Sequence, residues 1–212
     1  DGLSEKTLGR VLGRRRPSET ITTKFGLLPT PLIGSAGKAA PPLRKVRSLV
    51  NKLGLVPYPR RSYTAETMRK ALHTSLRALG TDYVDIYQVH EPLPDTVLSD
   101  ELIAELQRAK ASGKIRAIGV SGGAVDAMID RYRDIFDVIQ SAEGEWDEAR
   151  WVPDITHSLF SGAAVHGALP GDTVRRLLTA ALDRRPDGAV IVQTSNPERL
   201  RQIVEFANDP AR

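Results

Sequence analysis

The stretch Thr81–Pro92, TDYVDIYQVHEP, decides the fold, because it reads as a buried strand that ends on one histidine. Its centre is rich in β-branched and aromatic residues, which favour strands, and Glu91-Pro92 ends the strand just past His90. Parallel α/β folds place their chemistry at the carboxyl ends of their strands. The stretch therefore predicts a parallel fold with His90 at its functional end.

The same alternation of helix and strand runs along the whole chain. Apolar residues recur at helical spacing from Met68 to Leu79, with Thr64 as the N-cap and Gly80 as the residue that ends the helix. We expect further helices at 4–12, 100–112, 124–132, 172–183 and 197–207, with Ser4 as the cap of the first. We expect further strands at 20–24, 115–120, 136–140, 154–158 and 189–192. Each connection is long enough for a crossover, so parallel pairing is expected.

Composition bounds the class of protein. With 212 residues, 41% hydrophobic and 26% charged, the chain can bury a core, and we expect one domain over residues 1–212. The absence of cysteine excludes disulfides, zinc thiolate sites and a cysteine nucleophile. The sequence has no apolar run of transmembrane length and no signal-peptide pattern, so a cytoplasmic location is the default expectation.

The basic residues gather in clusters. The net charge of +4 comes largely from Arg14–Arg16, Arg44–Arg47 and Arg60–Arg61. Such clusters are found on nucleic-acid-binding proteins, but aromatic residues for stacking are interleaved only at Tyr58 and Tyr63. A solvated surface is the favoured interpretation, and neither nucleic acid nor a membrane is expected as a partner.

A long insertion interrupts the alternation of helices and strands. Residues 27–63 are rich in Pro, Gly, Lys and Arg, and only 43–53 has weak helical character. This composition predicts a loop over one mouth of the domain, a form that functional lids take.

Polar residues recur where the strands end. In a barrel these positions converge on one pocket, although polar residues can also simply mark where strands meet solvent. The last strand runs into a helix start with Arg199 one turn in, which fits either a phosphate site or an ordinary capped helix. Neither His73 nor His166 has metal-ligand partners at suitable spacing, so no metal site is expected. The strand-end residues are Lys24, His90, Ser121, Gln140, His157, Ser158, Gln193, Thr194, Ser195 and Asn196.

Four segments together resemble the aldo-keto reductases. They are Thr22–Gly26, Ser75–Gly80 running into the His90 strand, Gly113–Ser121 and Val190–Arg199, and they occur in that family's order. The resemblance implies a (β/α)8 barrel that binds NADP(H) and reduces aldehydes or ketones to alcohols, with a small carbonyl compound as substrate.

The resemblance also implies roles for the strand-end residues. Lys24 and His90 match the lysine and histidine of the family's Asp-Tyr-Lys-His tetrad. In the tetrad a lysine lowers the pKa of the proton-donating tyrosine, and the histidine orients the carbonyl. The implied cofactor-binding residues are Ser121 and Gln140 at the nicotinamide carboxamide, His157 and Ser158 near the nicotinamide ring, and Gln193, Thr194, Ser195, Asn196 and Arg199 at the 2′-phosphate.

The sequence departs from the family at several points. The tetrad's tyrosine and aspartate, and the first two strands, have no counterpart, so we expect about six of eight strands and open edges that could self-associate. Gly122 stands where the family usually has asparagine, His157 where it has an aromatic ring, and Gln193 where a basic residue or glycine is common. Two functions stay open: a reductase impaired by these losses, and an inactive reductase-like binding or regulatory protein.

Overall fold

The computed structural model describes residues 2–28, 60–161, 169–194 and 196–209. Most of the insertion at 27–63, including its weakly helical stretch at 43–53, lies outside these residues, as do His166 and Ser195. The predictions for those residues remain predictions.

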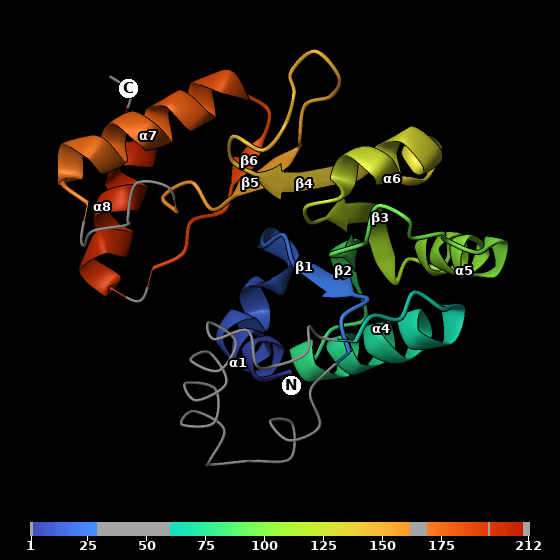
Figure 1. Cartoon of the computed structure of the whole chain (residues 1–212). Coiled ribbons are helices and arrows are strands. Elements are labelled where there is room, and N and C mark those ends of the chain that lie inside the picture. Colours follow the sequence, from blue (N-terminus) through green and yellow to red (C-terminus); the bar gives the residue numbers. More distant parts are fainter. Residues whose placement is uncertain (1, 29–59, 162–168, 195, 210–212) are drawn as a thin grey trace. The chain divides into compact units, whose positions relative to one another are not determined.

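Six strands form one sheet, and the strand pairs with a recorded register are parallel (Figure 1). Neighbouring strands are consecutive in the chain, and each is joined to the next by a crossover connection through a helix or a loop. Six parallel strands in an unclosed sheet match the predicted incomplete (β/α)8 barrel. The strands are β1 (Thr22–Phe25), β2 (Val84–His90), β3 (Ile115–Ser121), β4 (Val138–Ala142), β5 (Ile155–His157) and β6 (Ala189–Val190).

All six predicted helices are present. They are α1 (Leu3–Leu12), α4 (Ala65–Leu79), α5 (Asp100–Ala111), α6 (Val125–Tyr132), α7 (Gly171–Arg184) and α8 (Pro197–Ala207), with short 3-10 helices η1 (Gly13–Ser18) and η3 (Arg133–Ile135). The caps of α4 are as predicted: Thr64 Oγ1 accepts from Thr67 N at 3.2 Å, and Gly80 takes the left-handed conformation (φ 66°). None of the helices in the described ranges is both long and apolar enough to cross a bilayer.

Several predicted boundaries are wrong by one or two residues; β1, for example, begins at Thr22 rather than 20. Helix α1 begins at Leu3, because Gly2 occupies the N-cap position, so Ser4 is not the cap. Strand β4 begins at Val138 rather than 136, where pairing with β3 starts. Strand β6 stops at Val190 rather than 192, because its partner β5 is only three residues long.

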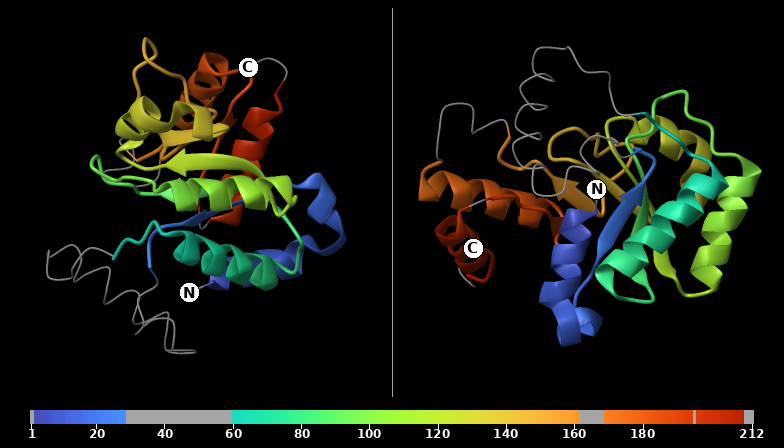
Figure 2. Two further views of the ribbon diagram at one scale, coloured as in Figure 1. Left: turned by 90° about the vertical axis from the view of Figure 1, so that its right-hand side faces the viewer. Right: turned by 90° about the horizontal axis from the view of Figure 1, so that it is seen from below.

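The chain falls into two compact units, which are described separately. Unit 1 comprises residues 1–91 and 95–118, and unit 2 comprises 92–94 and 119–212. In unit 1, α1, α4 and α5 lie in a row beside β1 and β2 (Figure 2). The rings of Phe25 and Tyr87 stack at 5.2 Å in its core. In unit 2, Val174, Leu178 and Ile203 form a core between α7 and α8.

Asp85 anchors the amino-terminal end of β2 in unit 1. Its carboxylate accepts from Ile21 N at 2.8 Å and pairs with Arg16 at 3.0 Å and Arg116 at 2.9 Å. Both guanidinium groups also lie over the ring of Tyr83, at 4.0 and 4.1 Å. Asp85 therefore has a structural role, as the partner of two arginines.

Candidate cofactor and active site

Lys24 and His90 lie on the same face of two adjacent strands in unit 1. Lys24 is in register with Gln88, and His90 follows two residues later on β2, so the three side chains share one face. On the opposite face Tyr87 donates to Met68 O of α4 at 3.1 Å, which identifies that face as the helix side. Lys24 and His90 are therefore on the face turned away from α4, at the carboxyl ends of β1 and β2.

Two opposing effects act on the pKa of the Lys24 side chain. Burial lowers the pKa of its ammonium group, while the negative charge of Glu91 acts in the opposite direction. A buried lysine with a nearby carboxylate can still carry charge at neutral pH, and a cation here would favour ionisation of any neighbouring phenol. The tetrad role of Lys24 stays a prediction.

Sequence reasoning missed a clamp around the strand ends. Tyr63 donates its hydroxyl to His90 O at 2.8 Å and to Glu91 O at 2.7 Å, and Arg61 Nε donates to Glu91 O at 2.9 Å. Glu91 has a left-handed backbone (φ 52°), which is costly for a residue with a side chain. Gly26 makes room for the clamp, because a Cβ there would lie 2.3 Å from the Tyr63 ring.

Tyr63 does not have the properties of the missing proton donor. Its hydroxyl proton is already donated to carbonyl oxygens. Burial raises the pKa of the Tyr63 hydroxyl to about 12, and Arg61 opposes this rise. A phenol activated by lysine would have a lowered pKa, so Tyr63 holds the strand ends in place rather than donating a proton.

Gln88 is a second residue that the sequence analysis did not single out. It is 0% exposed, and neither amide atom has a hydrogen-bond partner within the described ranges. Buried amides normally find partners, so an unpaired one on the face of Lys24 and His90 marks a polar position at the candidate site. Its type and position in β2 were readable from sequence, but its lack of partners was not.

In unit 2 the predicted nicotinamide residues come together. Ser121 pairs in register with Gln140, and both side chains are buried. Gln140 Nε2 lies 3.3 Å from His157 Nδ1, while Gln140 Oε1 has no partner in the described part of the chain. Ser158, directly after His157, has a left-handed backbone (φ 62°). Three of the predicted residues therefore form one polar cluster.

A cavity adjoins this cluster. It has a volume of about 290 Å³ and is lined by His157, Ser158 and Gln193, together with the apolar side chains of Leu159, Phe160 and Ile191. The structure thus brings the predicted residues at the ends of β5 and β6 to one space. A volume of this size accommodates a ring and part of a dinucleotide rather than a whole one.

The start of α8 is a capped helix. Asn196 Oδ1 accepts from Glu198 N at 2.9 Å and Arg199 N at 3.3 Å, and Thr194 Oγ1 accepts from Asn196 N at 3.1 Å. The capped-helix interpretation is therefore confirmed for Asn196, whose amide oxygen satisfies two helix-start N–H groups. Arg199 makes no side-chain hydrogen bond or ion pair with other described residues, so its guanidinium remains available to an anion.

The two tryptophans, Trp146 and Trp151, contact charged side chains of unit 2. Trp151 is buried and donates Nε1 to Asp126 at 2.5 Å, and the Trp146 ring lies under the Arg184 guanidinium at 5.7 Å. Trp151 therefore has a packing role.

Comparison with known proteins places these observations in one family. Residues 1–139 match the model of the Aldo/keto reductase family, a range that includes Lys24, His90 and Ser121. The chain is 36% identical over 99 residues to 6-dehydroglucose reductase of Novosphingobium aromaticivorans, covering 46% of this chain and 32% of that protein. It is 36% identical over 158 residues to the NADH-specific methylglyoxal reductase of Escherichia coli, covering 70% of this chain and 42% of that protein.

Solved structures agree on the fold. The holo form of aldo-keto reductase AKR11C1 from Bacillus halodurans superposes with a TM-score of 0.70 at 18% identity, covering 98% of this chain and 74% of that one. A second solved structure, that of PA4992 from Pseudomonas aeruginosa, superposes with a TM-score of 0.67 at 22% identity, covering 96% of this chain and 73% of that one. The sequence matches to the two curated reductases span less than half of each relative. With two thirds of its length matched by the family model and with the fold of its solved members, the chain belongs to the aldo/keto reductase family.

Proposed function

We propose that this polypeptide belongs to an NADP(H)-dependent oxidoreductase that reduces aldehydes or ketones to alcohols. The observation that carries the proposal is the placement of Lys24 and His90 on one face, at the carboxyl ends of adjacent parallel strands. This is the end of a (β/α)8 barrel at which catalytic residues gather. The names of the relatives, a methylglyoxal reductase and a 6-dehydroglucose reductase, favour a small polar carbonyl compound as substrate.

The residues of unit 2 fit a nicotinamide. The buried, unpartnered Oε1 of Gln140 can accept from the carboxamide N–H of that ring, and Ser121 beside it supplies a hydroxyl. His157, held through its contact with Gln140, presents an imidazole at the cavity where a ring could stack. When bound, the nicotinamide supplies the hydride.

Arg199 supports NADP(H) over NAD(H). Its unpaired guanidinium, one turn into α8, is suited to the charge and geometry of a 2′-phosphate. The N–H groups of the first turn are partly taken by Asn196, so the phosphate contact would depend on Arg199 and Thr194. The name of the Escherichia coli relative specifies NADH, so cofactor preference needs its own measurement.

In the reaction His90 would donate a hydrogen bond to the substrate carbonyl, which polarises it. Lys24 would stabilise negative charge on a neighbouring proton donor through its ammonium group. Tyr63 does not fit the role of the proton-donating tyrosine. A second candidate is a reductase-like protein that binds nucleotide without turnover.

A carbonyl-reduction assay separates the two candidates. The full chain is incubated with NADPH and methylglyoxal, and the loss of NADPH absorbance is followed for the wild type, His90→Gln and Lys24→Met. The reductase account expects turnover that either substitution lowers by about 10²-fold or more. Turnover that neither substitution changes would contradict it. Binding of NADPH without turnover would establish the alternative.

A further inference from the structure

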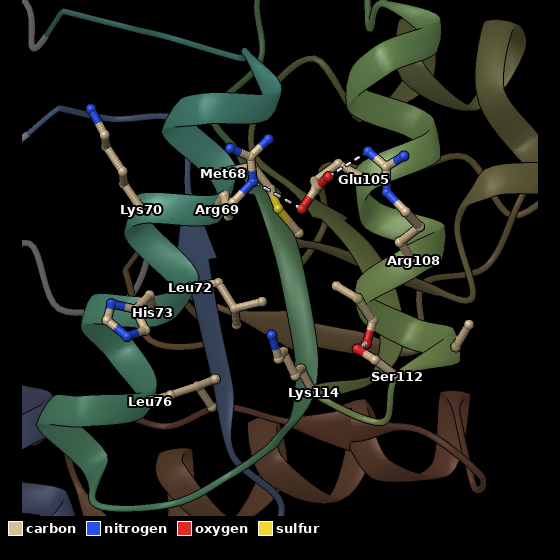
Figure 3. Close-up of a pocket in the computed structure, with 12 residues that line it drawn as sticks. Met68, Arg69, Lys70, Leu72, His73, Leu76, Glu105, Arg108, Ser112 and Lys114 are labelled. Atoms are coloured by element: carbon tan, nitrogen blue, oxygen red, sulfur yellow. Dashed lines mark hydrogen bonds and ion pairs between the residues drawn. The ribbon is translucent and has the colours of Figure 1, made fainter.

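A groove lies between α4 and α5 on the helix side of unit 1 (Figure 3). Its volume is about 800 Å³, which falls within the range of small-molecule sites, roughly 300–1,000 Å³. The lining residues come from the two helices and the turn that precedes β3, and neither Lys24 nor His90 is among them. The groove is therefore separate from the candidate catalytic residues of the same unit.

The floor of the groove is apolar. Leu72 and Leu76 of α4 point toward α5 (Figure 3), and Ala109 of α5 also lines the groove. Leu72 and Ala109 are 4% and 7% exposed, so they form a closed apolar base rather than a loose surface patch. Such a base favours the apolar part of a ligand over water.

The walls of the groove are predominantly cationic. Arg69 Nε and Arg108 Nη2 both pair with Glu105, at 3.1 and 2.5 Å (Figure 3). One carboxylate therefore serves two guanidinium groups, while Lys70 and Lys114 add two more positive charges to the lining. The resulting positive potential favours an anion.

Lys114 is the cation that remains without a counter-charge. Its ammonium group points into the groove between the two helices (Figure 3). It forms no ion pair or side-chain hydrogen bond with any residue in the described ranges, whereas Lys70 pairs with Glu66 at 2.5 Å. An ammonium group beside an apolar base is a suitable partner for a carboxylate.

We propose that this groove binds an amphipathic carboxylate. The apolar chain of the ligand lies over Leu72 and Leu76, and its carboxylate accepts hydrogen bonds from Lys114. A helix from a partner protein, with a diameter of about 10–12 Å, would need a wider opening than two helices in mutual contact leave. The combination of a partly open groove of this volume, an apolar base and a lysine without an ion pair among the described residues fits a small ligand.

Calorimetric titration of the full chain tests the proposal with octanoate, 1-octanol and octylammonium. We expect saturable binding of octanoate, binding of 1-octanol weaker by about tenfold, and no binding of octylammonium. Lys114→Gln should weaken octanoate binding by about tenfold without changing that of 1-octanol, and Lys114→Arg should restore it. Leu76→Glu should abolish binding of both.

Lys110→Gln is the matched control, because Lys110 lies on α5 but does not line the groove. It should leave octanoate binding unchanged. Thermal unfolding of each variant separates a loss of binding from a loss of fold, and Lys114 is exposed, so its substitution should not alter stability. Equal affinity for the three probes, or octanoate binding that Lys114→Gln does not change, would overturn the proposal.

Discussion

The Tyr63 hydroxyl donates to the backbone oxygen of Glu91 at 2.7 Å, and so fastens the residue that directly follows His90. Arg61 donates to the same oxygen, and the left-handed conformation of Glu91 is held from two sides. This clamp fixes the carboxyl end of β2, where the histidine lies. Strain at such a position persists only where the surroundings maintain it.

Removing the hydroxyl tests the clamp. Tyr63→Phe keeps the ring against Gly26 but removes the hydroxyl donor from His90 O and leaves Arg61 as the donor to Glu91 O, so the free energy of unfolding should fall by about 1–2 kcal/mol. Urea denaturation measures the change. Tyr83→Phe is the control, because Tyr83 contributes its ring rather than its hydroxyl to its contacts, and it should change stability by less than about 0.5 kcal/mol. An equal loss in both variants would contradict the clamp.

Substitution of Gly26 is a second test of the contact between this residue and the Tyr63 ring. Gly26→Ala should destabilise the fold by about 2–3 kcal/mol, because φ is 121° and the new Cβ would lie 2.3 Å from the Tyr63 ring. Replacing Tyr63 by serine in the same chain should recover part of that loss, which a double-mutant cycle would detect. Gly123→Ala, where a Cβ meets nothing within 4 Å, is the control. Strictly additive effects at positions 26 and 63 would rule out the steric coupling.

The helices and strands were largely predictable because their signals are local. Thr64 and Gly80 bound α4 through contacts within one turn, and β-branched and aromatic residues mark β2. The clamp was not predictable, because Tyr63 and His90 are 27 residues apart and the accepting atoms belong to the backbone, which carries no sequence signal. The end of β6 depended on the length of its partner β5, which is a property of the sheet.

The candidate site was predictable only in part. Register places Lys24 beside Gln88 and Ser121 beside Gln140, as polar strand ends in a parallel sheet require. The role of Asn196 stayed open in sequence, since a cap and a phosphate site use the same residue types, and only the hydrogen bonds to Glu198 and Arg199 distinguish them. Gln88 was missed because its lack of partners is a three-dimensional fact.

Substitution of Asp85 should lower the free energy of unfolding strongly. Asp85→Asn leaves Arg16 with no carboxylate at a position where both side chains are 11% exposed, so stability should fall by about 3 kcal/mol. Guanidinium denaturation, whose salt weakens surface pairs more than buried ones, should be compared with urea. Asp82→Asn is the matched control, because Asp82 is exposed in the preceding turn and should have little effect. A loss below about 0.5 kcal/mol for Asp85→Asn would contradict the anchoring role.

The lowered pKa of Lys24 leads us to expect that the stability of the protein depends on pH. Its pKa in the folded state lies below 10.5, so the folded state binds fewer protons than the unfolded state between the two values. Stability should therefore rise as the pH increases from the folded pKa toward 10.5, relative to Lys24→Met, in which this contribution is absent. Below the folded pKa the difference between the two proteins should be constant.

Glu91 provides the internal check on that prediction. Because its charge raises the pKa of Lys24, Glu91→Gln should lower that pKa further and move the rise in stability to lower pH. Lys6→Met, at an exposed lysine, should leave the profile unchanged. Superimposable profiles for wild type and Lys24→Met across this range would exclude a perturbed lysine.

A fluorescence titration of the full chain with NADPH most directly tests the claim that the polar cluster of unit 2 binds a nicotinamide cofactor. The account predicts saturable binding that Gln140→Ala and Ser121→Ala weaken, and that Arg199→Gln weakens for NADPH but not for NADH. Glu205→Gln, on the same helix as Arg199, should leave both affinities unchanged. The absence of saturable binding up to millimolar NADPH and NADH would contradict the account.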